Sequence, residues 1–182
     1  MSCCKGQTIL RNNKIQKLGG WSFEPELYEF LVANLPFGST ILELGSGYGT
    51  DVLSQHYTMF SIEHNAKFVG SFNSTYIHAP MDGHWYHRPS IEDKLPEKYD
   101  AILVDGPVGD QSRNRIGFWE NFDLFHLDVL LVIDDTNRKG ERMLFDKILD
   151  VCNFDFGSEQ VLPEEEHRKF QHFKTFSVIY PK

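Results

Sequence analysis

The sequence has 182 residues, which is enough for one well-packed domain and short for two, so residues 1–182 are expected to form a single domain. Hydrophobic residues make up 41% of the chain and charged residues 24%, as in ordinary globular proteins, and the lack of an apolar run of about 18 residues argues against a membrane protein. A formal net charge of −8 argues against nucleic acid as a partner, because that binding depends on cationic contacts to phosphate.

The start of the chain predicts a lead-in followed by a helix. Residues 1–20 are polar with scattered apolar side chains, and their pattern does not lead us to expect a secretion signal. The three cysteines do not form a disulfide framework, so we expect a reducing, cytoplasmic location. We expect Trp21 to fill the core, with a place in the substrate pocket as the alternative. The early proline, the acids and the apolar spacing of residues 24–32 predict a helix.

The middle of the chain alternates between short apolar runs and helical stretches. Strands are predicted at residues 40–44, 57–63, 75–78, 100–105 and 127–133, with an extra β segment at 85–86. Helices are predicted at residues 51–56, 64–70 and 140–151, and a further helical stretch is predicted to end at about residue 125. On the last helix, Met143, Leu144, Ile148 and Leu149 are expected to share one face. This alternation predicts a Rossmann-like, doubly wound α/β fold with a mainly parallel sheet and a ligand crevice at the carboxyl ends of its strands. Residues 154–162 and 173–180 are predicted to form an antiparallel C-terminal hairpin.

A glycine-rich loop follows the first predicted strand. Gly45, Gly47 and Gly49 alternate with Ser46 and Tyr48, and the loop leads into a helix whose free N–H groups would face a ligand. A dinucleotide fingerprint would need its third glycine one residue later. Glu43, just before the loop, would repel a pyrophosphate but suits a ligand that carries positive charge, as S-adenosylmethionine does.

The segment Glu-Leu-Gly-Ser-Gly-Tyr-Gly-Thr, residues 43–50, resembles the first motif of class I S-adenosylmethionine-dependent methyltransferases. Residues 60–63 resemble the second strand of these enzymes, and residues 99–107 resemble the fourth. The resemblance implies S-adenosylmethionine as cofactor, a small-molecule methyl acceptor, and a fold that ends in an antiparallel hairpin. The cofactor-binding residues that it implies, together with the spacing, are Glu43, Gly45, Ser46, Gly47, Gly49, Thr50, Glu63, His64, Asp82 and Asp105.

Some of these residues have expected roles. Glu63 ends the second strand, where its carboxylate can accept two hydrogen bonds from a ribose diol; a solvated strand-end acid is the alternative. His64 would border the adenine, and Asp82 could accept a hydrogen bond from the adenine amino group. His78, His84 and His87 suggest a metal cluster, but their spacing favours surface or capping histidines instead.

Asp105 ends the fourth strand and is the first candidate for a catalytic residue, as a positioning group, base or metal ligand. Catechol-type O-methyltransferases, which the chain also resembles, bind Mg²⁺ with an acid after strand four and an Asp-Asn pair after strand five. Here the pair is Asp134-Asp135, so a metal site of Asp105, Asp134 and Asp135 is chemically possible, while the departure favours a metal-free mechanism. In that alternative Asp134 or Asp135 caps the next helix or pairs with Arg138 or Arg142.

The motif around Asp105-Gly106-Pro107 and residues 133–142 also resembles small, mostly uncharacterised bacterial methyltransferases and plant glucuronoxylan O-methyltransferases, whose acceptor is a sugar acid. We therefore expect O-methylation of an anionic or sugar-like acceptor bound by Arg113, Arg115, Asp134 and Arg138. The arginines could instead be solvated or paired with the aspartates. A non-enzymatic S-adenosylmethionine or nucleotide binder of the same fold is the second function class. A nucleotide-dependent oxidoreductase is disfavoured by Gly49 and Glu43.

Overall fold

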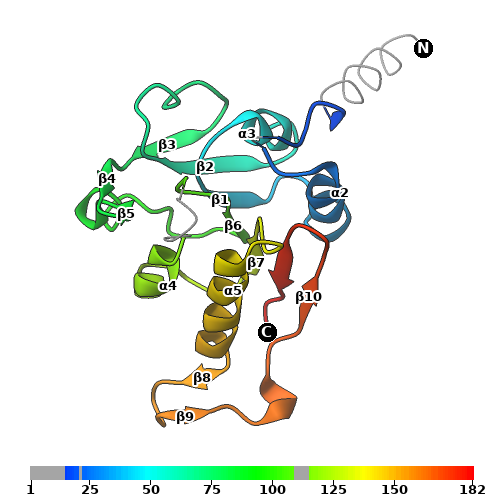
Figure 1. Ribbon diagram of the computed structural model, residues 1–182, viewed down its shortest axis with the longest axis vertical. Coiled ribbons are helices and arrows are strands. Elements are labelled where there is room, and N and C mark those ends of the chain that lie inside the picture. Colours follow the sequence, from blue (N-terminus) through cyan, green and yellow to red (C-terminus); the bar gives the residue numbers. More distant parts are fainter. Residues whose placement is uncertain (1–14, 21, 109–114) are drawn as a thin grey trace.

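The computed structural model describes residues 15–20, 22–108 and 115–182; the predictions for Trp21 and Arg113 fall outside these ranges. A seven-stranded sheet with the order β3-β2-β1-β6-β7-β11-β10 runs through the molecule (Figure 1). Its strands are β1 (Thr40–Leu44), β2 (Thr58–Glu63), β3 (Thr75–His78), β6 (Ala101–Val104), β7 (Leu130–Ile133), β10 (Phe170–His172) and β11 (Ser177–Ile179). The predicted strands of the central sheet are thus present, with shifts of a few residues at their ends.

The pairing directions confirm the predicted fold class. Strands β1, β2, β3, β6 and β7 pair in parallel, whereas β11 is antiparallel to both β7 and β10. The prediction for the first arm of the closing hairpin was wrong, because β10 provides that arm. Residues 154–162 instead form a separate pair, β8 (Phe154–Asp155) and β9 (Gln160–Val161). The buried Arg168 explains the difference: it donates to the backbone carbonyls of Leu127, Val129 and Tyr180 and so fixes the chain beside β7 just before β10.

Helices pack on both faces of the sheet because the side chains of each strand alternate between the faces. On one face, Leu42 and Leu44 of β1 lie in a core with residues of α4 (Gly117–Glu120) and α5 (Lys139–Cys152). On the other face, Ile41 lies in a core with residues of α2 (Pro25–Asn34) and α3 (Tyr48–Leu53). Both cores reach the same carboxyl ends of the parallel strands, where the chain leaves the sheet in loops.

Two predicted helices differ from the structure. Helix α3 begins at Tyr48 instead of Asp51, because Gly47 already serves as its N-terminal boundary and donates its N–H to Thr50 Oγ1. Residues 64–70 form turns and not a helix. The side chain of Asn65 accepts from the Lys67 N–H, and Gly70 has φ +79°, so local turn contacts replace the helical hydrogen bonds.

The remaining elements are short, and α5 corrects one prediction. As predicted, Trp85–Tyr86 forms a β segment, β5, which pairs with β4 (Met81–Asp82). Three 3-10 turns occupy Arg88–Ser90, Phe122–Leu124 and Glu164–Glu166. On α5 the buried face contains Glu141, Leu144, Phe145 and Ile148, whereas Met143 is 50% exposed because it lies about 100° away from Leu144 around the helix. In the described ranges, no helix combines the length and apolar character needed to cross a bilayer.

Candidate functional site

A cavity of about 170 Å³ lies where β1, β2, β6 and β7 end. Its wall combines the glycine loop, the acids at the strand ends, the start of the loop after β6, and the N-terminal part of α5. The lining residues are Gly20, Ser22, Glu43, Gly45, Ser46, Gly47, Gly49, Glu63, His64, Phe68, Asp105, Gly106, Pro107, Val108, Arg115, Asp134, Asp135, Arg138 and Glu141. Most of the residues predicted for the site therefore surround one space at the predicted edge of the sheet.

Two glycines are required by close packing around this cavity. A side chain at Gly49 would collide with the ring of Phe23, which packs under the first turn of α3. A Cβ at Gly106 would lie 2.7 Å from Gly45 Cα and 2.6 Å from the Tyr86 hydroxyl. Gly45 itself has φ +93°, a conformation that side chains other than glycine rarely adopt. The loop after β1 and the loop after β6 therefore touch through backbone alone.

Glu43 is buried at the bottom of the cavity. Its Oε2 accepts hydrogen bonds from the Thr50 hydroxyl at 2.7 Å and the Ser61 hydroxyl at 2.9 Å. Burial raises the pKa of Glu43 to about 7, although both hydroxyls oppose the shift. A cation that enters the cavity would offset this cost of burial and favour the ionised carboxylate.

Glu63 ends β2 and is also buried. Its Oε1 accepts a hydrogen bond from the Asn65 backbone N–H at 2.6 Å. The same oxygen lies 3.1 Å from His64 Nδ1, but the two atoms are not oriented for a hydrogen bond. These contacts fix the carboxyl group at the cavity wall and use only one of its oxygens among the described residues. The arrangement leaves Glu63 Oε2 available to a ligand.

Three predicted cofactor residues have different placements. Ser46 lines the cavity, and its hydroxyl bonds to those of Thr50 and Tyr76. Thr50 is fully buried behind the loop, where it binds Glu43 and does not line the cavity. Asp82 is exposed on β4 and is likewise outside the cavity wall. The structure thus brings Ser46 to the site and gives Thr50 a supporting position.

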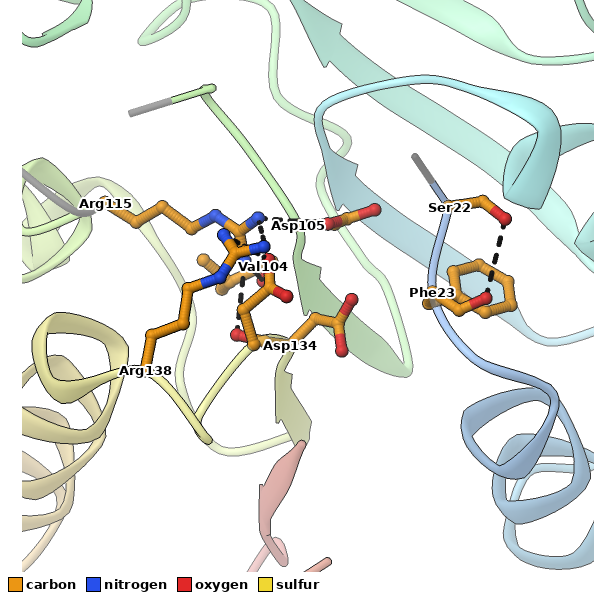
Figure 2. A network of polar contacts seen from close by, with 8 residues as sticks. Ser22, Phe23, Val104, Asp105, Arg115, Asp134 and Arg138 are labelled. Carbon is orange, nitrogen blue, oxygen red and sulfur yellow. Dashed lines mark hydrogen bonds and ion pairs between the residues drawn. The ribbon is translucent and has the colours of Figure 1, made fainter. Parts of the chain in front are cut away.

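Asp105, Asp134 and Asp135 form a cluster at the ends of β6 and β7. One carboxylate oxygen from each can be chosen so that all lie within 4.8 Å of one another. Arg115 Nη2 binds Asp105 Oδ1 at 3.2 Å and Asp135 Oδ2 at 2.7 Å, while Nη1 donates to the backbone carbonyls of Val104 and Asp134. Figure 2 shows Arg115 and Arg138 converging on this cluster, with Ser22 and Phe23 across from it. Arg115 is therefore committed to protein partners, as in the alternative that pairs the arginines with the aspartates.

The cluster has unusual electrostatics. Burial raises the pKa of Asp105, with Arg115 opposing the shift. Burial also raises the pKa of Asp134, and the charges of Asp105 and Asp135 add to the effect. Arg138 is 59% exposed on its side chain and binds Asp135 Oδ2 at 2.9 Å. Neither aspartate after β7 caps α5, since the N-cap is Arg138 and has no side-chain cap bond.

The donor set of the cluster fits a divalent cation. Carboxylate oxygens are the ligands that Mg²⁺ prefers, and both arginines bind the same oxygen of Asp135. Arg115 likewise takes only one oxygen of Asp105, so each aspartate keeps an oxygen clear of the arginines. The guanidinium groups then orient the carboxylates from outside. The histidine cluster is not supported: His78 contacts the His64 carbonyl, His84 binds Glu120, and His87 binds Ser90.

The sequence analysis missed several residues of the cavity wall, above all Glu141. Glu141 is 2% exposed, and its Oε2 is buried without a hydrogen-bond partner among the described residues. Its position three and four residues before the buried Leu144 and Phe145 places an acid on the apolar face of α5, which is a signal that the sequence contains. Ser22, Phe68 and Val108 also line the cavity but have no comparable signal.

No protein-family model and no curated protein matches the sequence. Among solved structures, the MycE methyltransferase from the mycinamycin biosynthetic pathway, in complex with Mg and SAH (S-adenosylhomocysteine), superposes with TM-scores of 0.59 and 0.54 in two crystal forms. The identities are 10% and 12%, and the matches cover 94% and 86% of this chain and 52% and 45% of that enzyme. The chain thus spans about half the length of MycE.

A TehB-like SAM-dependent methyltransferase from Corynebacterium glutamicum is also similar, with a TM-score of 0.47 and 12% identity over 85% of this chain and 86% of that one. The strand order and the antiparallel β11 agree with the MycE superpositions. The chain therefore has the fold of the class I S-adenosylmethionine-dependent methyltransferases.

Proposed function

We propose that the chain transfers the methyl group of S-adenosylmethionine to a hydroxyl group of a small molecule. The observation that carries this proposal is a single cavity in which the glycine loop and Glu63 are continuous with the carboxylates of Asp105 and Asp134. The glycine loop and Glu63 suit the cofactor, and the carboxylates of Asp105 and Asp134 suit the acceptor. A protein that only bound the cofactor would not need a second, buried carboxylate cluster beside it, so the same observation disfavours the non-enzymatic alternative.

The cofactor end would hold S-adenosylmethionine by charge and by hydrogen bonds. Glu63 Oε2 would accept from the ribose hydroxyls, and the close approach at Gly45 and Gly47 would admit the methionine part. The buried carboxylate of Glu43 would stabilise the positive charge of the cofactor, because opposite charges attract strongly where water is excluded. All four of these residues line the cavity.

The acceptor end would align the hydroxyl and remove its proton. Transfer from a sulfonium is an in-line displacement, so the main requirement is to hold donor and acceptor close and aligned. Asp105 lies at the start of the loop after β6, between the two ends of the cavity. Its raised pKa brings the carboxyl closer to the range in which a general base works best at neutral pH. We propose that, when no cation is bound, Asp105 receives the acceptor proton, with Asp134 beside it.

A divalent cation such as Mg²⁺ would be held by Asp105, Asp134 and Asp135. When bound, it would lower the pKa of an acceptor hydroxyl and help to orient it. Arg115 would keep the carboxylates of Asp105 and Asp135 in place, and Arg138 would add a second contact to Asp135. The relative MycE is described in complex with Mg and SAH, which is consistent with such a site in this fold.

The cofactor assignment predicts that the chain binds SAH in calorimetric titration and does not bind NAD. Glu63→Ala should weaken SAH binding by about 1–3 kcal/mol, because charge-assisted hydrogen bonds to the ribose are lost. Asp82→Ala should leave the affinity unchanged, since Asp82 is exposed outside the cavity wall. Equal SAH affinity in native chain and Glu63→Ala, or tighter binding of NAD, would falsify the assignment.

The metal assignment predicts that excess EDTA reduces methyl transfer at least tenfold and that Mg²⁺ restores it. The magnitude follows from the loss of a cation that stabilises the reacting oxygen, an effect worth several kcal/mol. SAH affinity should stay within about twofold, because Glu43 and Glu63 are not members of the aspartate cluster. Full turnover in EDTA would instead establish a metal-free mechanism in which Asp105 acts alone.

A further inference from the structure

Glu141 is a buried carboxylate without an evident function in the fold. It belongs to the first turn of α5, and 2% of its surface is exposed. Its Oε2 has no hydrogen-bond partner among the described residues, although it lines the cavity. An unpaired buried carboxylate oxygen is costly, because the group has lost its water without gaining a donor. A ligand in the cavity is the natural source of that donor.

The surroundings of Glu141 indicate which end of the cavity it serves. It follows β7 in the chain, as do Asp134, Asp135 and Arg138, whereas the glycine loop and Glu63 follow β1 and β2. Burial raises the pKa of Glu141, and the charges of Arg115 and Arg138 oppose the shift. Neither arginine forms an ion pair with it, since both bind Asp135. The free oxygen of Glu141 is thus on the acceptor side and remains unpaired.

We propose that Glu141 binds the methyl acceptor by accepting a hydrogen bond from a hydroxyl or ammonium group on it. The inference rests on the proposed function, whose cofactor end it leaves unchanged. A carboxylate at this place would repel an acceptor carboxylate or phosphate. The acceptor is therefore a neutral or cationic polyhydroxyl or amino compound, and not the sugar acid that the arginines suggested.

The charges of the whole cavity support this choice of acceptor. Among the described residues, six carboxyl groups line it, namely Glu43, Glu63, Asp105, Asp134, Asp135 and Glu141, against the two guanidinium groups of Arg115 and Arg138. Arg115 directs its donors to Asp105, Asp135 and two backbone carbonyls. In the metal-free, SAH-bound chain, an anion would consequently meet mostly negative charge from these groups, whereas a donor-rich molecule meets unpaired acceptors.

The test is a calorimetric titration of the SAH-saturated chain, in EDTA, with glucosamine and with glucuronate. These two probes share a pyranose ring and carry opposite charges. Glucosamine should bind more tightly, and Glu141→Gln should weaken its binding about tenfold or more, because a hydrogen bond to a charged group is lost. Asp146→Asn, an exposed acid on the same helix, should leave its binding unchanged.

The outcomes separate the inference from the proposed function. Glucosamine binding that is absent, or equal in native chain and Glu141→Gln, overturns the role of Glu141, as does tighter binding of glucuronate. A lower melting temperature of Glu141→Gln with unchanged glucosamine affinity would make Glu141 a structural residue of α5. Failure of SAH to bind in the preceding titration would reject the proposed function instead, and glucosamine titration of the SAH-free chain would then still report on Glu141.

Discussion

Arg115→Gln is expected to lower the free energy of unfolding by about 3–5 kcal/mol, measured by urea denaturation in EDTA at pH 7. The side chain of Arg115 is 7% exposed, and it binds Asp105 and Asp135 together with the backbone carbonyls of Val104 and Asp134. Removing this buried ion-pair partner takes away the ion pair of Asp105 and leaves Asp135 with only the exposed Arg138, which is the basis of this magnitude. Asp105, Asp134 and Asp135 would then repel one another at short range.

The effect of Arg115→Gln should shrink at lower pH. Asp105 and Asp134 have raised pKa values in the folded chain, so they bind protons more tightly there than in the unfolded chain. Their contribution to stability is therefore present at low pH and is lost as pH rises from the ordinary carboxyl range toward neutrality. Without Arg115, the free energy of unfolding should fall more steeply as pH rises. The free energies of unfolding of Arg115→Gln and the native chain should therefore converge at acid pH.

Arg138→Gln is the matched control for Arg115. Arg138 binds the same Asp135 oxygen, but its side chain is 59% exposed, and we expect a loss of about 1 kcal/mol or less. If Arg115→Gln kept the native stability and raised only the Michaelis constant for the acceptor, Arg115 would bind substrate, as the sequence suggested.

Asp105→Asn is expected to reduce the rate of methyl transfer by about 10²- to 10⁴-fold, measured as initial SAH formation at saturating S-adenosylmethionine. This range is typical for the loss of a general base. Asparagine keeps the shape of the side chain, and burial at this position disfavours the charged carboxylate, which is why its pKa is raised. The melting temperature and the SAH affinity should therefore stay close to those of the native chain.

Asp93→Asn provides a comparison, because Asp93 is an exposed acid outside the cavity wall. It should leave the rate unchanged. Recovery of the Asp105→Asn rate in high Mg²⁺ would identify Asp105 chiefly as a metal ligand. A rate within threefold of the native value would remove Asp105 from the chemistry and leave Asp134 as the next candidate.

Sequence patterns were sufficient for the central sheet because its signals are local. The apolar run at residues 40–44, the glycines that follow it and the acid at Glu63 each specify an element within a few residues, and the structure confirms these strands. The prediction for the first arm of the closing hairpin was wrong because that arm depends on contacts distant in the sequence. Arg168 places β10 by binding carbonyls about 40 residues away in the chain, at Leu127 and Val129, and no local pattern reports such contacts.

The site shows the same division between local and distant determinants. Residues at strand ends, such as Asp105 and Asp134, could be predicted because parallel strands bring their carboxyl ends together. For Arg115, pairing with the aspartates was one of the alternatives, whereas its hydrogen bonds to the backbone carbonyls of Val104 and Asp134 had no signal in the sequence. Asp82 was predicted to contact the cofactor, but it is exposed on the β4–β5 hairpin and does not line the cavity.

The contact between Gly45 and Gly106 limits how this protein can diversify. Any side chain at position 106 would push the loop after β6 away from the glycine loop and toward the Tyr86 hydroxyl, so both loops would have to change at once. Val108 carries no such restriction, since it is 67% exposed although it lines the cavity. Relatives that adapt to new acceptors should thus vary after this glycine pair, while the half of the cavity proposed to hold the cofactor is inherited unchanged.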